Sequence, residues 1–148
     1  MSELSLLTTL NVASSGMNVQ RGRLNVIAEN LANVNSTKTE DGGAYRRKEA
    51  IIQAMPFKSA DEFANLLDAK QIQIASVTVV KESTKPLPQI YDPSHPDSDE
   101  NGYLEIPDVQ VSQELMDMMS AARSYEANVT AFNTTKSMVL KTLEIGGA

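Results

Sequence analysis

The chain has 148 residues with no Cys, no Trp and one His, and its formal net charge at pH 7 is −6. The length fits a single domain, and the lack of Cys excludes disulfides, thiol nucleophiles, thiolate zinc sites and iron–sulfur clusters. The acidic balance disfavours nucleic acid as a partner. No apolar stretch of about 18 residues is present, so we expect no membrane insertion, and we see no leader of the cleavable type.

The N-terminal segment carries a seven-residue apolar repeat. Its spacings alternate between four and three, which is typical of a coiled-coil seam and predicts a helix from about Ser5 to Asn33. The opposite face is rich in Asn, Ser, Thr and Gly, which are poor helix formers, so we expect the helix to form only when packed. Asn30 and Asn33 are expected to cap it or to bond backbone groups in the following turn. The seam positions are Leu6, Leu10, Ala13, Met17, Gln20, Leu24, Ile27, Leu31 and Val34.

The middle of the chain predicts a small β-rich module. A first strand is expected over residues 45–55, because Pro56 disfavours its continuation. Residues 71–82 alternate apolar and polar side chains and predict a second strand. Residues 87–91 and 103–106 are weaker candidates among five of the six prolines. Residues 61–69 predict a short helix or an ordered loop.

The negative charge is concentrated in one segment. From Pro86 to Ala122 there is no Lys or Arg. A solvated loop surface is one interpretation, and contact with a basic partner or a cation is another. The acidic residues of this segment are Asp92, Asp97, Asp99, Glu100, Glu105, Asp108, Glu114 and Asp117.

Residues 97–108 partly match a calcium-binding EF-hand loop, with oxygen-bearing side chains at positions 1, 3, 5, 9 and 12 and Gly102 at position 6. Pro93 and Pro96 leave no room for the entering helix, which argues against calcium. His95 is expected to make a loop hydrogen bond. With no phosphate-binding glycine loop and one His in a proline-broken loop, we expect no enzyme activity, no metal site and no cofactor.

The C-terminal segment repeats the heptad pattern and predicts a helix from about Ser112 to Leu143 that ends at Gly146-Gly147. Each terminal helix would be about 45 Å long, whereas a compact chain of this size has a radius of gyration of about 15 Å. The helices therefore close on each other as a hairpin or also pack against neighbouring subunits. The seam positions are Val111, Leu115, Met118, Ala122, Tyr125, Val129, Phe132, Lys136, Val139 and Leu143.

Several segments resemble those of the bacterial flagellar rod and hook proteins. Residues 27–37 resemble their Asn-Leu-Ala-Asn-x-Asn-Thr box, and residues 114–118 and 122–128 resemble their C-terminal helix. A loop specific to proximal rod proteins of the C type is matched by His95, Pro96, Asp97, Gly102 and Tyr103. The resemblance covers nearly the whole chain.

The resemblance implies a structural subunit of the flagellar basal-body rod, which is a drive shaft and export channel. The fold is expected to be α+β: residues 1–36 and 110–148 pair as elongated, coiled-coil-like helices that form a tube, and residues 37–109 form an outward-facing β-rich module. Expected partners are copies of itself, other rod proteins, the type III export apparatus and the rod cap. The expected location is the periplasmic rod, reached without a cleaved signal peptide.

The residues expected to contact neighbouring subunits lie on both helices. Among them, Arg123 is expected to bond an acidic group on a neighbour. A calcium-binding module using residues 97–108 and a cytoplasmic two-helix adaptor remain the alternatives. The expected contact residues are Leu6, Leu10, Met17, Leu24, Ile27, Asn30, Leu31, Asn33, Leu115, Met118, Arg123, Tyr125, Glu126, Asn128, Val129, Phe132 and Lys136.

Overall fold

The computed structural model describes residues 3–40, 42–56 and 73–146. The elements in chain order are α1 (Glu3–Ala32), β1 (Lys48–Pro56), β2 (Gln73–Glu82), β3 (Gln89–Tyr91), β4 (Tyr103–Glu105) and α2 (Val111–Gly146). The α+β prediction is confirmed, and each expected helix or strand boundary lies within three residues of the observed one. The helix or loop expected over residues 61–69 lies outside the described residues.

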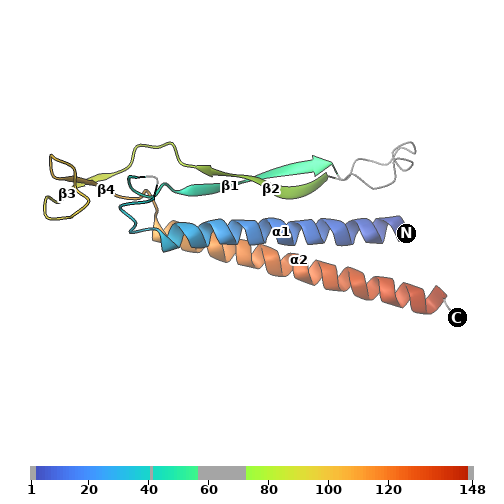
Figure 1. Ribbon diagram of the computed structural model, residues 1–148. Coiled ribbons are helices and arrows are strands. Elements are labelled where there is room, and N and C mark those ends of the chain that lie inside the picture. The colour runs from blue at the N-terminus through green and yellow to red at the C-terminus, as the bar shows by residue number, and fades with distance from the viewer. Residues whose placement is uncertain (1–2, 41, 57–72, 147–148) are drawn as a thin grey trace.

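The molecule is elongated and has three layers (Figure 1). The two helices run antiparallel along each other, and the β1–β2 hairpin lies on the side of α1 that faces away from α2. The free ends of the helices lie at one end of the molecule, and the β3–β4 hairpin lies at the other. Neither helix, as far as the described residues go, is long and apolar enough to cross a membrane.

The two hairpins are separate two-stranded antiparallel sheets. In the larger one the register runs from Lys48 opposite Glu82 to Pro56 opposite Gln73, with an irregularity between Ile51 and Ile52. At that point β2 has one extra residue, which is the signature of a β-bulge. In the smaller sheet, Ile90 lies opposite Leu104 and Tyr91 opposite Tyr103.

The core is thin and centres on α1. This middle helix contributes the buried side chains of Ala13, Val19, Val26 and Ile27. The buried side chains of α2 are instead Glu114, Ala121 and Thr135, which recur at multiples of seven and therefore lie on one face. The buried positions of α2 thus hold no large apolar side chain.

The two helices approach each other closely near the middle of α1. A Cβ atom added to Gly16 would lie 2.7 Å from Asn128 Nδ2, which is closer than real Cβ contacts. A larger residue at position 16 would therefore require the Asn128 side chain to move. Gly16 allows this close approach, and larger apolar residues of α2 such as Val129 and Phe132 are half-buried.

Candidate functional site

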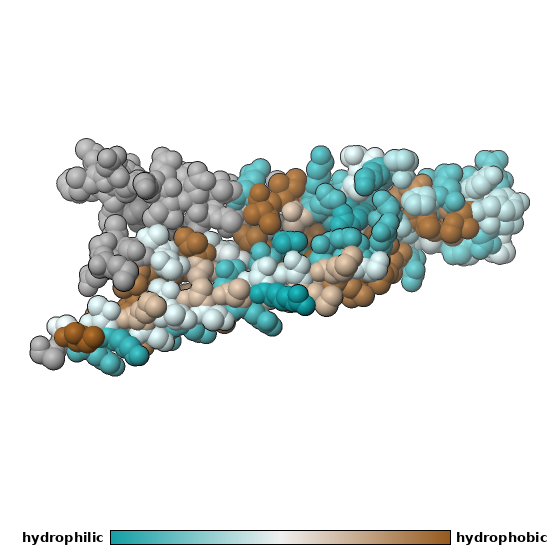
Figure 2. Space-filling model, turned by 180° about the vertical axis from the view of Figure 1, so that it is seen from behind, coloured by the Kyte–Doolittle hydropathy of each residue, from teal (hydrophilic) through white to brown (hydrophobic). Residues whose placement is uncertain are grey.

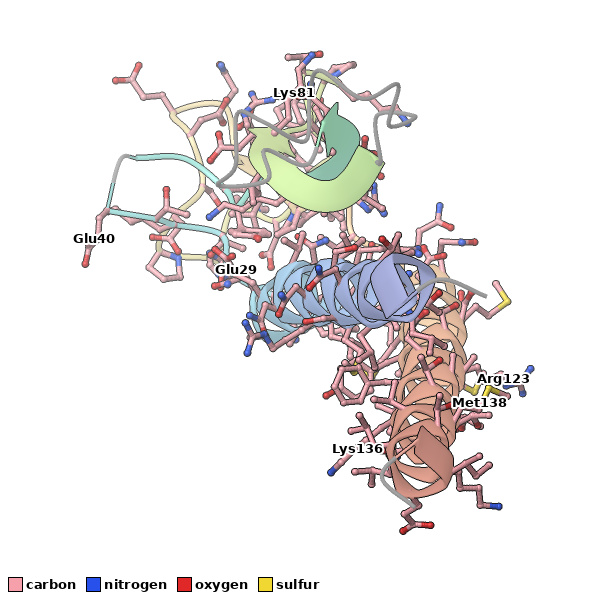
Figure 3. All side chains as sticks on the ribbon, turned by 90° about the vertical axis from the view of Figure 1, so that its right-hand side faces the viewer. Glu29, Glu40, Lys81, Arg123, Lys136 and Met138 are labelled. Atoms are coloured by element: carbon pink, nitrogen blue, oxygen red, sulfur yellow. The ribbon has the colours of Figure 1, made fainter. Side chains whose placement is uncertain are left out.

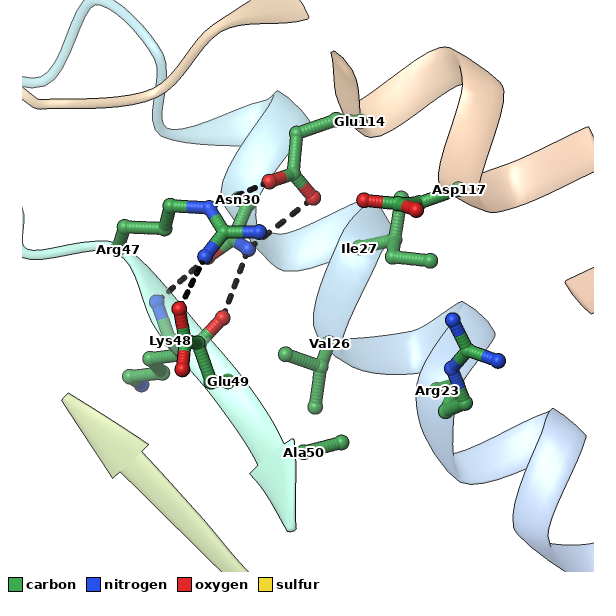
Figure 4. A pocket seen from close by; sticks show the side chains of 10 residues that line it. All are labelled: Arg23, Val26, Ile27, Asn30, Arg47, Lys48, Glu49, Ala50, Glu114 and Asp117. Atoms are coloured by element: carbon green, nitrogen blue, oxygen red, sulfur yellow. Dashed lines mark hydrogen bonds and ion pairs between the residues drawn. The ribbon is translucent and has the colours of Figure 1, made fainter. Parts of the chain in front are cut away.

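A buried polar cluster joins three elements that are distant in the sequence (Figure 4). Asn30 lies near the end of α1, Arg47 directly precedes β1, Lys48 is the first residue of β1, and Glu114 lies in the first turn of α2. Asn30 and Glu114 have the largest fully buried side chains among the described residues. Because buried polar groups lower stability unless they are bonded, the contacts of these two residues decide whether the elements can meet here.

Asn30 uses its whole hydrogen-bonding capacity. Its Oδ1 accepts from the Lys48 N–H at 2.9 Å and from the Tyr45 hydroxyl at 3.0 Å. Its Nδ2 donates to the Lys48 carbonyl at 2.9 Å and to Glu114 Oε2 at 3.2 Å. An amide offers two donors and two acceptor lone pairs, so Asn30 has no unused polar group.

Glu114 supplies the negative charge of the cluster. Arg47 Nε donates to Glu114 Oε1 at 2.7 Å, and Arg47 Nη1 donates to Glu49 Oε1 at 2.6 Å. An acidic side chain in the first turn of a helix also interacts favourably with the helix dipole. Beside this group, Lys48 pairs with Glu29 at the surface. The buried charge is therefore both paired and hydrogen-bonded.

A hollow of about 200 Å³ opens beside the cluster, between α1, β1 and the start of α2. Arg23 and Asp117 line it from the two helices (Figure 4), and their hydrogen-bonded side-chain partners are the neutral amides of Gln20 and Gln113. Within the described ranges, no group of three or more His, Cys, Asp or Glu side chains is arranged to hold a metal ion. The geometry supports a structural junction that fixes the relative positions of α1, β1 and α2.

Tyr45 provides a pH-dependent readout of the junction. Burial, aided by the charges of Glu29, Glu82 and Glu114, raises the pKa of its hydroxyl from 10.0 to about 12. A raised folded-state pKa contributes stability that is fully present below the unfolded-state pKa and is lost as the pH rises through the folded one. Relative to Tyr45→Phe, the free energy of unfolding of the wild type should therefore fall between pH 10.0 and about pH 12, as measured by urea unfolding. A difference that stays constant with pH would contradict this.

The loop between β3 and β4 is held by its own polar groups. Asp92 Oδ1 accepts from the Ser94 N–H and hydroxyl, which lowers the pKa of this exposed carboxyl. Asp99 Oδ1 accepts from the N–H groups of Asn101 and Tyr103 at 2.9 and 2.8 Å. The Asp97 N–H donates to His95 Nδ1 at 3.1 Å, which is the loop hydrogen bond expected for His95.

This arrangement gives no support to the calcium interpretation of residues 97–108. Asp97 Oδ2 accepts from the Thr37 hydroxyl at 2.8 Å and so ties the loop to the segment that follows α1. Asp99 binds backbone N–H groups. Asp97 and Asp99 thus satisfy protein donors, and the acidic side chains of the described loop are not arranged as a group of three or more that could hold an ion. Spacing alone could not reveal this. Residues 97–108 contain the end of the β3–β4 loop and the whole of β4, and no helix leads into them.

The contact residues expected from the sequence lie in different environments. On α1, Ile27 is buried, and Leu6, Leu10, Met17, Leu24 and Leu31 are half-buried. On α2, Leu115, Arg123, Tyr125, Glu126 and Lys136 are exposed, and Met118, Asn128, Val129 and Phe132 are half-buried. Asn33 caps its own helix by donating to the Glu29 carbonyl at 2.9 Å. Asn30 reaches the first residue of β1, not the turn after α1.

Sequence reasoning missed the roles of Arg47, Tyr45 and Glu114 in the junction. The sequence marks Glu114 as one charge of the acidic segment and as part of the segment that resembles the family's C-terminal helix, but not as a partner of Arg47. One signal was available: it is an acidic residue in the first turn of the predicted C-terminal helix, next to a seam position. Arg47 lay in the predicted first strand, where nothing in the alternation of side chains marked its partner.

The comparisons with known proteins agree on one family. The model of the flagella basal body rod protein family matches residues 10–38, and that of the flagellar basal body rod FlgEFG protein C-terminal region matches residues 100–145. The chain is 40% identical to the flagellar basal-body rod protein FlgC of Borreliella burgdorferi over 149 residues, covering 96% of this chain and 98% of that protein.

Two further relatives with the same name come from other bacteria. The Salmonella typhimurium protein is 40% identical over 145 residues, covering 97% of this chain and 99% of the relative. The Bacillus subtilis protein is 35% identical over 148 residues, covering 93% and 96% of the two chains. The similarity therefore extends over the helices and the central module alike.

Proposed function

Because the chain belongs to the FlgC family of flagellar basal-body rod proteins, it is a structural subunit of the basal body, and we propose that its terminal helices join it to its neighbours in the rod. The neighbours are other rod components and copies of the chain itself. In this arrangement the helices of residues 1–36 and 110–148 form the wall of a tube that serves as drive shaft and export channel, and residues 37–109 face outward.

The observation that carries this proposal is the uncovered apolar face of α2. Val111, Leu115 and Met119 recur every four residues on one side of the helix and are 45%, 46% and 55% exposed. Seen from behind, apolar side chains remain open to solvent along the helical side of the molecule (Figure 2). Exposed apolar surface of this kind marks an interaction site. Further along α2, the exposed apolar residues are Met138, Leu140, Leu143 and Ile145.

The hydroxyl groups of α2 can also be buried against a neighbouring subunit. Five of them donate to the backbone carbonyl four residues earlier, at 2.8 to 3.0 Å. A hydroxyl that is already bonded can be covered by a neighbour without leaving an unpaired donor. The polar residues of this helix therefore do not oppose close packing. The exposed hydroxyl-bearing residues in question are Thr130, Thr134, Ser137 and Thr142, with Ser124 half-buried.

Arg123 is the charged residue of α2 that we assign to a neighbouring subunit. Its side chain is exposed and projects to the side of α2 (Figure 3). Among the described residues it has neither a hydrogen bond nor an ion pair within the chain. An acidic group on an adjacent rod subunit would give Arg123 an ion-pair partner. In the same way, an adjacent helix would cover the exposed seam residues of α2.

The proposal includes the route to the rod. The subunit passes unfolded through the flagellar type III export apparatus, without a cleaved signal peptide, and assembles beneath the rod cap in the periplasmic space. The thin core supports this route. Because the described part of the chain buries few large apolar side chains, little stabilising energy opposes unfolding before export.

The test places charge on the uncovered face. In cells deleted for the gene, the double variant Leu115→Lys with Met119→Lys should appear in isolated basal bodies at a level lower by on the order of tenfold, with loss of swimming, because lysine resists burial. The matched control is Gln113→Lys with Ser120→Lys, which adds the same charge to another side of α2. Normal incorporation of the first variant would contradict the proposal.

A further inference from the structure

The β3–β4 hairpin and its loop, residues 89–105, form a tip that exposes apolar surface. Ile90, Tyr91 and Tyr103 are 50%, 65% and 47% exposed. The two tyrosine rings pack edge to face, with their centroids 5.4 Å apart. Aromatic side chains that stay exposed on a short hairpin are typical of the centre of an interaction surface.

The tip is rigid before any partner arrives. Gly102 has a φ of +81°, and a Cβ added there would lie 3.0 Å from Tyr91 Cε2, so the Tyr91 ring rests on a surface that only glycine provides. The Asp92 N–H donates to the Gly102 carbonyl at 2.9 Å, and the Asp99 N–H donates to the Tyr103 carbonyl at 2.9 Å. A surface that is already ordered loses little conformational entropy on binding.

The tip is also uniformly acidic. Asp99, Glu100 and Glu105 are exposed beside the tyrosines, and none of them has an ion pair with a described residue. The one ion pair from the tip to a basic residue elsewhere in the described chain is between Asp97 and Lys38, at 4.0 Å. The negative charge of the tip is therefore available to a basic partner.

A second surface of the same chain has the opposite charge. The β1–β2 hairpin exposes Ile51, Ile52 and Val80. Next to them, Lys81 and Lys85 are exposed, and in the described part of the chain neither ammonium group is paired with an acid. Figure 3 shows Lys81 projecting from the hairpin away from the helices. Because neighbouring residues of a strand point to opposite faces, Lys81 shares its face with Ile51 and not with Val80. Ile51, Lys81 and Lys85, called the hairpin surface below, combine exposed apolar area with free positive charge.

We propose that the tip of one copy docks on the hairpin surface of the next copy in the rod. Both surfaces expose apolar side chains, and their unpaired charges are opposite. Lysine ammonium groups also interact favourably with tyrosine faces. Because the two surfaces differ, the contact is heterologous and joins successive copies head to tail. This contact rests on the rod assembly proposed above and adds a second interface, between the central modules.

Charge reversal with rescue tests the contact. We expect the tip variant, Glu100→Lys with Glu105→Lys, and the hairpin variant, Lys81→Glu with Lys85→Glu, each to reduce the chain in isolated basal bodies by about tenfold. A chain carrying all four substitutions restores the opposite charges and should return to within about twofold of the wild type. The control Glu40→Lys, at an exposed residue outside both surfaces, also makes the chain less negative and should incorporate normally.

The outcomes separate this contact from the proposed function. Wild-type protein missing from basal bodies would overturn the function itself. Wild-type protein present, with tip variants that incorporate normally or with no rescue by the fourfold variant, would overturn the tip contact alone. The cysteine-free chain allows a second readout, because in rods built from a Glu100→Cys and Lys81→Cys double variant, oxidation should give a ladder of linked copies. Absence of the ladder would also overturn the contact.

Discussion

Replacing Glu114 by alanine should lower the free energy of unfolding by about 3 kcal/mol, because it leaves a partly buried arginine and a buried amide without their shared acceptor. Arg47 would keep only Glu49, whose side chain is 63% exposed. Asn30 Nδ2 would keep only the Lys48 carbonyl. Urea unfolding of the purified chain, followed by circular dichroism, measures the change.

The matched control for this variant is Asp117→Ala, one turn further along α2. Its side chain is only half-buried and accepts from Gln113 alone, so the change should stay within about 0.5 kcal/mol. A double-mutant cycle with Arg47→Ala should give a coupling energy of about 2 kcal/mol with Glu114. If the two substitutions change the free energy of unfolding additively, the coupling energy is zero and the ion pair between Arg47 and Glu114 does not stabilise the chain.

Replacing Asn30 by aspartate should destabilise the chain by a similar amount, about 3 kcal/mol, although the side-chain shape hardly changes. The two N–H donors to the Lys48 carbonyl and to Glu114 Oε2 are lost. A second carboxylate then faces Glu114 in a buried site, and like charges at this distance repel. Urea unfolding again provides the measurement.

Two further comparisons make this test specific. The destabilisation by Asn30→Asp should shrink on acidification, because protonation of either carboxyl removes the repulsion and restores one donor. Asn33→Asp, which alters an amide at the exposed end of α1, should change stability by no more than about 1 kcal/mol. If Asn30→Asp and Asn33→Asp lowered the free energy of unfolding equally, the loss would come from negative charge at the end of α1 and not from the junction.

The long helices and the main hairpin were predictable because each rests on local pattern. Heptad spacing located α1 and α2, and alternation with β-branched residues located β2. The β-bulge at Ile51 and Ile52 was not predictable, since it depends on which strand carries the extra residue after pairing. The contact between Gly16 and Asn128 was equally hidden, because it joins positions more than one hundred residues apart that carry no apolar signal.

The face of α2 that packs on α1 shows the limit of the pattern more sharply. Counting apolar residues pointed to a seam through Leu115 and Tyr125, and both are exposed in the single chain. The packed face contains Glu114, Ala121 and Thr135, which a hydropathy pattern ignores. The hydropathy pattern therefore did not single out the packed face: of its seam positions, Leu115 and Tyr125 are exposed, whereas Phe132 is half-buried.

The hydrogen bonds of Asn30 have a consequence for how copies of the chain can meet. A two-stranded sheet has two outer edges, and an unpaired edge is a template for strands of other chains. At Lys48, both backbone groups on the outer edge of β1 are already bonded by one side-chain amide. The Asn30 amide thus makes, at this one residue, the two hydrogen bonds that a neighbouring strand would otherwise make. Copies crowded side by side in a rod cannot begin to merge their hairpins into a continuous sheet at this residue.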